Sequence, residues 1–305
     1  MPLHIQTPLV ESRPLSVLTG RSIWLKLDAL QPSGSFKLRG IGFACEHNAR
    51  AGKRRFVSSS GGNAGIAVAY AGRCLSIPVV VVVPETTTEL AKALIRQEAA
   101  EVVVHGASWM EANAHAQTLI DETTAFIHPF DDPLLWEGHA SMIDEVVQAG
   151  ESFDAVVLSV GGGGLLSGVV EGLDRNGLKT PVIAVETEGA ASLARSVQAG
   201  RRIELAAITS IATTLGAKQV CAQAFQLTQT HAIRCALVSD QQALSACERF
   251  LDDHRILVEP ACGAALALAY DGADALGDVK KILMIVCGGA TAGIDLQRQW
   301  AAALG

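Results

Sequence analysis

The sequence predicts an α/β fold built on two doubly wound, mostly parallel sheets, and three observations lead to this prediction. Short apolar, β-branched runs alternate with longer amphipathic stretches along the chain. The apolar runs are nearly continuous, which is typical of parallel strands covered by helices on both faces. Glycine-containing loops follow three of these runs, at the carboxyl ends of strands, where such sheets bind ligands.

The individual elements follow from this alternation in chain order. Strands are predicted at residues 55–57, 79–83, 101–104, 155–160, 182–185 and 282–286, because each run is short and apolar. Helices are predicted between them, at residues 64–74, 88–99, 108–122, 165–175 and 241–254, where the stretches are longer and amphipathic.

Composition narrows the class of protein. The chain has 305 residues, 49% of them hydrophobic and 18% charged, which fits a globular enzyme with two domains. A net charge of −7 argues against a nucleic-acid partner, which requires a clustered basic surface. We find no apolar run long enough for a bilayer and no secretory signal, so we expect no membrane partner. Seven scattered cysteines without a C-x-x-C pair favour the cytoplasm and argue against both a disulfide framework and a zinc site.

Lys37 is the first candidate for chemistry. The segment Pro32-Ser33-Gly34-Ser35 predicts a turn with a serine N-cap, so Phe36 and Lys37 should begin a helix. The positive end of the helix dipole and the adjacent aromatic ring both disfavour the ammonium form, which leaves an amine able to form a Schiff base. A solvated surface lysine is the common alternative, and Phe36 is either core or packed on a cofactor ring.

Two further loops could bind anions. Gly161, Gly162, Gly163 and Gly164 offer bare backbone N–H groups at a helix start, which suits a phosphate; a plain turn is the alternative. A dinucleotide loop would need glycine at position 166, which is Leu166. Ser60, Gly61, Gly62 and Asn63 either form an ordinary helix entry or hold a carboxylate, with the Asn63 amide on a phenolic oxygen.

Cys287 follows the last predicted strand. It is either a buried packing residue or a neutral thiol facing a pyridine nitrogen. A thiol does not keep that nitrogen protonated, which favours loss of a β-leaving group over transamination or racemisation. The lysine, the phosphate loop and the thiol together indicate pyridoxal phosphate and an enzyme that eliminates water from a small hydroxy amino acid.

These motifs resemble the fold-type-II, tryptophan synthase beta-like family of pyridoxal phosphate enzymes, and most closely its serine/threonine dehydratase branch, of the mammalian type. The resemblance covers nearly the whole chain. The residues that carry it are 33–40, 60–65, 136–139, 161–168, 186–190, 209–217, 259–265 and 287–289.

The resemblance implies a role for each candidate. Lys37 holds the cofactor as a Schiff base and later takes the Cα proton, Phe36 packs on the ring, and Asn63 binds its 3-oxygen. Gly161 to Gly164 with Leu165 bind the phosphate, and Cys287 faces the ring nitrogen. Ser60, Gly61, Gly62 and Asn63 bind the substrate. The implied activity is that of an L-serine/L-threonine dehydratase, which releases pyruvate or 2-oxobutanoate and ammonia.

The resemblance also implies an organisation. We expect a large cofactor-binding domain (residues 1–39 and 138–305), a small domain (residues 40–137), a homodimer and no regulatory domain. A K⁺ ion is expected near Glu186, Ala190, Leu215 and Ala217. Gly61 stands where related racemases carry a serine, so racemase activity should be weak, and Thr214 stands where smaller residues are common in the family.

Three other functions stay open at this point. A β-replacement enzyme of the cysteine synthase type would use the same scaffold. A non-catalytic protein that binds a phosphorylated ligand would not need the Schiff-base lysine. A nucleotide-dependent dehydrogenase is disfavoured by Leu166.

Overall fold

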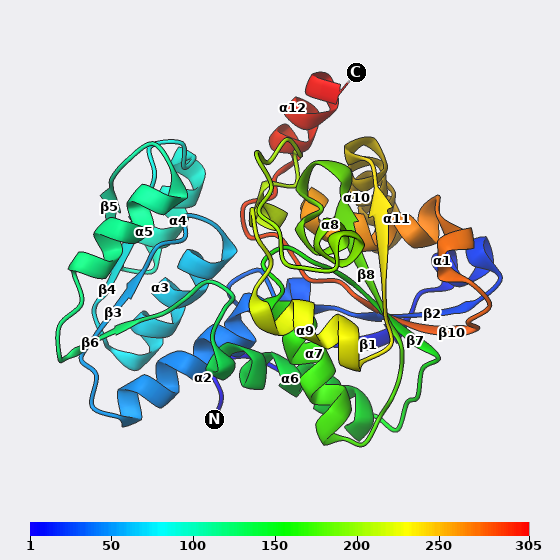
Figure 1. The fold of residues 1–305 in the computed structure, drawn as a ribbon, viewed down its shortest axis with the longest axis horizontal. Helices are drawn as coiled ribbons and strands as arrows, with labels where there is room; N and C mark the ends of the chain where they lie inside the picture. The colour runs from blue at the N-terminus through cyan, green and yellow to red at the C-terminus, as the bar shows by residue number, and fades with distance from the viewer. Residues whose placement is uncertain (305) are drawn as a thin grey trace.

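The computed structural model describes residues 1–304, and their strands form two sheets in two lobes that lie side by side (Figure 1). The larger sheet has six strands in the order β1-β2-β10-β7-β8-β9, and the smaller has four in the order β5-β4-β3-β6. Strands β1 and β2 pair antiparallel, and every other described pair is parallel. The predicted α/β class with mostly parallel sheets is therefore confirmed.

The strands include four that the sequence did not predict. Strands β1, β6 and β9 lie at sheet edges and are partly exposed, so they lack the continuous apolar run of a central strand. Strand β2 ends in the charged residue Lys26. The strands are β1 (Leu9–Glu11), β2 (Ser22–Lys26), β3 (Arg55–Ser58), β4 (Val79–Val83), β5 (Glu101–Val104), β6 (Thr124–Phe126), β7 (Ala155–Ser159), β8 (Val182–Thr187), β9 (Ile233–Val238) and β10 (Lys281–Ile285).

The five helices whose bounds were predicted begin and end close to those positions, with one correction. Helix α5 begins after a capping box between Ser108 and Glu111 and ends at Thr118 rather than at 122, because β6 follows from Thr124. The helices are α1 (Arg13–Thr19), α2 (Lys37–Arg50), α3 (Asn63–Leu75), α4 (Glu89–Gln97), α5 (Trp109–Thr118), α6 (Pro133–Gln148), α7 (Gly164–Arg175), α8 (Ser192–Ala199), α9 (Ala222–Thr230), α10 (Asp240–His254), α11 (Pro260–Tyr270) and α12 (Ile294–Leu304).

Each sheet is buried in apolar side chains. All residues of β4 are valines with at most 5% of their surface exposed, and β7 and β8 are buried along their whole length. A buried valine or leucine side chain contributes about 1.5–3 kcal/mol, so these central strands are the main source of stability. None of the helices within residues 1–304 is long and apolar enough to cross a bilayer.

Helices α2 and α6 carry the chain from the larger sheet to the smaller one and back (Figure 1). Their backbones touch, since a Cβ atom on Gly138 would lie 2.7 Å from the Cα of Gly40. A Cβ atom on Gly40 would lie 2.4 Å from the carbonyl oxygen of Leu135. The expected domain boundaries, after residues 39 and 137, fall inside these two helices, and the division into domains stays a prediction.

Candidate active site

Lys37 is the first residue of α2, as the sequence predicted. Its Nζ donates a hydrogen bond to the carbonyl oxygen of Pro129 at 2.6 Å and lies 5.1 Å from the centre of the Phe36 ring. Burial lowers the pKa of Lys37 to about 8, although the nearby Cys287, Glu259 and Cys221 side chains favour the charged form. A lysine with this pKa has a substantial fraction of nucleophilic amine near neutral pH.

The predicted serine N-cap of α2 is wrong. Phe36 occupies the N-cap position without a side-chain cap, and the buried hydroxyls of Ser33 and Ser35 bond to none of the described residues. Backbone contacts hold this turn instead: Phe36 N–H donates to Cys287 O at 2.9 Å, and Gly289 N–H donates to Gly34 O at 3.0 Å. The last strand therefore positions the start of α2 and places Lys37 beside Cys287.

Phe36 is half-buried, and its ring packs against the imidazole of His139, with ring centres 4.9 Å apart. Gly40 N–H donates to His139 Nδ1 at 3.2 Å, and burial lowers the pKa of His139 well below its ordinary value. The imidazole is therefore neutral and carries its proton on Nε2, which has no hydrogen-bond partner among the described residues. His139 fixes the Phe36 ring next to Lys37.

The glycine loop (Gly161, Gly162, Gly163 and Gly164) connects β7 to α7, with Gly163 at the N-cap in the left-handed region (φ +94°). No backbone N–H group from Gly161 to Leu165 donates a hydrogen bond to a described residue. These free donors at the start of a twelve-residue helix are available to an anion, and the phosphate site stays a prediction.

The structure gives a further reason for the glycines. Cβ atoms at Gly162 and Gly163 would lie 2.3 Å from the Phe130 ring and 2.5 Å from the Ala224 side chain. A Cβ atom at Gly161 would lie 2.9 Å from the Cα of Leu215. Neighbouring residues of the protein therefore fill the space of the absent side chains, and close packing requires glycine in addition to the approach of an anion.

The loop of Ser60, Gly61 and Gly62 leads into α3, which begins at Asn63. The backbone N–H groups of Gly61 and Asn63 donate to no described residue, so they are free for a carboxylate. A Cβ atom on Gly61 would lie 2.6 Å from Cγ2 and 2.7 Å from Oγ1 of Thr87, a contact that the sequence did not indicate.

Asn63 is buried, and its side-chain amide is held from both sides. Its Oδ1 accepts a hydrogen bond from Ala290 N–H at 2.9 Å, and its Nδ2 donates to Glu259 Oε1 at 2.7 Å. Thr214 Oγ1 donates to the same Oε1 at 2.7 Å. Burial raises the pKa of Glu259 to about 7, against the hydrogen bonds from Thr214 and Asn63.

Glu259 was not predicted to have a role, although it lies in one of the stretches that carry the resemblance. A signal was present, since Glu259 directly precedes Pro260 at the start of α11, a helix without a single charged residue and buried along its whole length. A charged residue at the entrance of such a helix is a candidate for a specific contact.

Cys287 follows β10 and is only 6% exposed. Two effects raise the pKa of the Cys287 thiol well above its ordinary value. The larger is hydrogen bonding with the Cys262 side chain, and the second is burial. The thiol is therefore neutral, in agreement with the chemistry expected of it.

The candidate residues come together from both lobes. Gly161 contacts Leu215, Thr214 lies 3.8 Å from the Cβ position of Gly62, and Pro129 accepts the hydrogen bond of Lys37. An amine of lowered pKa, a neutral thiol, an amide with one free N–H and a row of free backbone donors fit the aldehyde, ring nitrogen, 3-oxygen and phosphate of pyridoxal phosphate.

The expected cation site stays a prediction. Both carboxylate oxygens of Glu186 accept hydrogen bonds from backbone N–H groups of α8, those of Leu193 and Ala194, and burial raises the pKa of Glu186 to about 7. Ala190 ends the short helix that follows β8, and the Leu215 carbonyl accepts from Ala217 N–H at 2.8 Å. Residues 1–304 contain no group of three or more His, Cys, Asp or Glu side chains suited to a metal ion.

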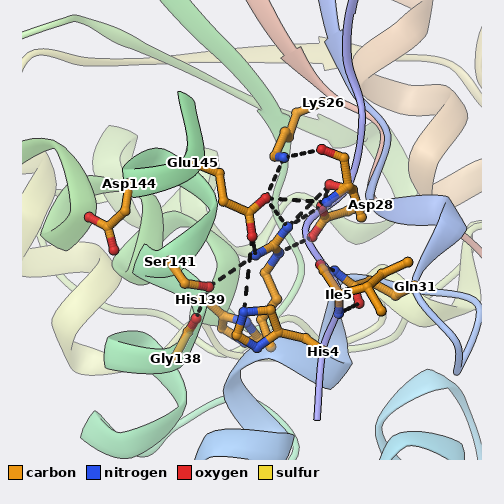
Figure 2. Close-up of polar contacts among 12 residues, drawn as sticks. His4, Ile5, Lys26, Asp28, Gln31, Gly138, His139, Ser141, Asp144 and Glu145 are labelled. Carbon is orange, nitrogen blue, oxygen red and sulfur yellow. Dashed lines mark hydrogen bonds and ion pairs between the residues drawn. The ribbon is translucent and has the colours of Figure 1, made fainter. Parts of the chain in front are cut away.

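A buried ion cluster lies two residues from Lys37. The Arg39 guanidinium forms paired hydrogen bonds with Asp28 (2.6 and 3.0 Å) and with Glu145 (2.6 and 2.8 Å). Figure 2 shows Lys26 on the other side of Glu145, to which its Nζ donates at 2.5 Å. Two positive and two negative charges balance, and they connect α2, the end of β2 and α6.

Comparison with known proteins agrees with this site. Residues 1–288 match the family model described as "Pyridoxal-phosphate dependent enzyme". The chain is 45% identical to the L-serine dehydratase of Dictyostelium discoideum, over 94% of this chain and 89% of that protein. It is 47% identical to the human L-serine dehydratase/L-threonine deaminase, over 95% and 92%.

Among solved structures, the L-serine ammonia-lyase of Rhizomucor miehei superimposes with a TM-score of 0.94 at 33% identity, covering 99% of each chain. The fold, the assembled site and the family match lead to one conclusion. The chain belongs to the fold-type-II family of pyridoxal-phosphate-dependent enzymes.

Proposed function

We propose that this protein is an L-serine/L-threonine dehydratase, which converts the hydroxy amino acid into pyruvate or 2-oxobutanoate and ammonia. The observation that carries the proposal is the Lys37 amine of lowered pKa beside a neutral thiol and free backbone donors. The relatives named L-serine dehydratase, which match nearly the whole chain, support the same reaction.

Each residue has a defined task in this reaction. The backbone N–H groups from Gly161 to Leu165 would bind the phosphate, the free N–H of the Asn63 side-chain amide would bind the 3-oxygen, and Cys287 would face the ring nitrogen. Bound pyridoxal phosphate supplies a ring that accepts the electron pair left when the Cα proton departs. Lys37 would hold the cofactor and, once the substrate has displaced it, would take up that proton at Nζ, while Ser60 and its loop would bind the substrate carboxylate.

The neutral Cys287 thiol directs the outcome. Because a thiol would not keep the ring nitrogen protonated, the ring would stabilise negative charge at Cα less, which favours prompt loss of the β-hydroxyl, as water once it takes up a proton. Loss of water gives an enamine, which hydrolyses to the 2-oxo acid and ammonia. Gly61 places no hydroxyl on its side of the substrate, so racemisation should be slow.

The proposal extends to assembly and compartment. We propose a homodimer in the cytoplasm, with the domain division and the K⁺ site as stated above. All seven cysteines are free, and most are buried, which suits a reducing compartment. Sedimentation of the purified protein tests the dimer directly.

A visible absorption spectrum tests the function. Wild-type protein and Lys37→Ala are compared before and after L-serine is added, with 2-oxo acid assayed in parallel. We expect a yellow band and pyruvate from the wild type and neither from the variant. Pyruvate replaced by a new amino acid when sulfide is added would indicate a β-replacement enzyme, and no band with added pyridoxal phosphate would exclude the whole proposal.

A further inference from the structure

Glu259 is a carboxylate buried beside the candidate site, where burial of a charged group is costly. It is only 4% exposed, and both hydrogen bonds that it receives, from Asn63 and Thr214, end on Oε1. Its Oε2 accepts no hydrogen bond from the described residues. Burying a carboxylate costs several kcal/mol unless partners compensate, so two donors on one oxygen form a specific arrangement rather than incidental packing.

The Asn63 amide can adopt two orientations, and its neighbours permit only one. Ala290 N–H requires an oxygen on its side, and Glu259 Oε1 requires an N–H on the other side. A flipped amide would place two donors together and two acceptors together, losing both hydrogen bonds. In the permitted orientation, one of the two Nδ2 hydrogens bonds to Glu259 and the other stays free.

We propose that Glu259 is a positioning residue of this site: it fixes the Asn63 amide so that one N–H is free to bind the cofactor 3-oxygen. This inference rests on the proposed function only for the identity of the group that receives the free N–H. Glu259 acts through its acceptor oxygen, and Asn63 makes the contact.

Thr214 stabilises this arrangement. Its side chain is exposed at the site, and its hydroxyl donates to the oxygen that accepts from Asn63. The resemblance implies that smaller residues are common at this position. The Thr214 hydroxyl restricts the rotation of the Glu259 carboxylate and thereby the orientation of Asn63.

Two substitutions at Glu259 separate an acceptor role from a charge role. Glu259→Gln keeps an oxygen that can face Asn63 and Thr214, with its amide nitrogen on the side of the unbonded Oε2. Glu259→Leu has a similar size but no acceptor. We expect the dissociation constant of pyridoxal phosphate, titrated into apoprotein, to rise about tenfold in Glu259→Leu and less than threefold in Glu259→Gln.

Thr214→Val and Thr213→Val are a matched pair in which each loses one exposed hydroxyl. Thr213 has no side-chain hydrogen bond among the described residues, so its variant should bind the cofactor like the wild type. Thr214→Val should raise the dissociation constant about threefold, with an unchanged melting temperature of the apoprotein. In a Glu259→Leu background it should add nothing, because both variants remove the same support.

The outcomes are distinct. If Glu259→Gln and Glu259→Leu raised the dissociation constant of pyridoxal phosphate equally, the charge of Glu259 would matter and the proposal would be overturned. An unchanged dissociation constant in both variants would also overturn it. If Glu259→Leu does not fold, Thr214→Val provides the test: a dissociation constant equal to that of Thr213→Val would overturn the proposal. Wild-type protein that binds cofactor but forms no oxo acid would remove the proposed function and leave the Glu259 result intact; wild-type protein that binds no cofactor would overturn both.

Discussion

The amine of Lys37 has a single hydrogen bond, to the carbonyl oxygen of Pro129, and no acidic partner in direct contact. Its lowered pKa therefore comes from burial rather than from a specific charge. The sequence indicated the direction of this shift from the helix start and the aromatic neighbour. Cys287, Glu259 and Cys221, which are distant in sequence, act in the opposite direction and favour the charged amine, so burial outweighs them.

The first prediction concerns the pH dependence of cofactor uptake. Only the neutral amine attacks an aldehyde, and with a pKa of about 8 its fraction falls tenfold per pH unit below pH 8. The rate at which apoprotein develops a visible band with pyridoxal phosphate should therefore rise from pH 6 and level off above pH 8. Stopped-flow absorbance measures it, and a rate still rising between pH 9 and 10 would show an ordinary lysine.

The second prediction concerns the contact between Gly61 and Thr87. A serine at position 61 places its Cβ within 2.7 Å of Thr87 side-chain atoms, and such overpacking costs about 1–3 kcal/mol. We expect Gly61→Ser to lower kcat/KM at least about fivefold and the double variant Gly61→Ser/Thr87→Ala to recover most of this loss. Thr87→Ala alone is the control; a fully active Gly61→Ser would show that Thr87 moves aside freely.

At the scale of elements, α2 and α6 are held together by two kinds of contact. The glycines Gly40 and Gly138 let the backbones touch, and the ion cluster around Arg39 connects both helices to the end of β2 (Figure 2). Replacing such a cluster by apolar residues is often neutral, whereas removing one member leaves a buried charge unpaired. Removing a single member of the cluster should therefore cost more stability than replacing the whole cluster by apolar residues.

The third prediction follows for Arg39. Arg39→Met leaves the buried carboxylate of Asp28 and the partly buried one of Glu145 without their main partner, and we expect it to lower the free energy of unfolding by about 3–5 kcal/mol. Arg73→Met, which breaks the more exposed pair with Glu98, should cost less than about 1 kcal/mol. Urea unfolding of apoprotein measures both, and equal costs would contradict a special role for the cluster.

Over the whole molecule, the candidate site joins the two lobes. Asn63 and the loop before it extend from the smaller sheet, whereas the glycine loop and Cys287 extend from the larger one. A cofactor that bonds to both sides stabilises the folded state by mass action, by about 2.7 kcal/mol at a free concentration 100 times its dissociation constant.

The fourth prediction is a concentration-dependent rise in melting temperature when pyridoxal phosphate is added to apoprotein. At a free pyridoxal phosphate concentration about 100 times the wild-type dissociation constant, we expect the melting temperature of the wild type to rise by about 5–10 °C. The rise should be much smaller for Lys37→Ala at the same concentration, because this variant lacks the covalent link. Differential scanning calorimetry measures both. An equal rise in the two proteins would show that Lys37 does not hold the cofactor.

Much of this site could be predicted because its residues follow strands directly. The turns after β3, β7 and β10 are local in sequence, so Asn63, the glycine loop and Cys287 could be placed at one edge of the sheets from the pattern alone. Ser33 and Ser35 show the limit: they have the sequence of an N-cap, but tertiary contacts with the last strand override it.

The sequence by itself determined the α/β class, the order of the central strands along the chain and the loops that carry the candidate site residues, because apolar periodicity and strand-to-helix turns are local signals. Only the tertiary structure decided the hydrogen bond between Asn63 and Glu259, which are 196 residues apart, and the pairing of Arg39 with Glu145. Such contacts form only when helices and strands pack against one another, and a local sequence pattern does not show which distant residues will meet.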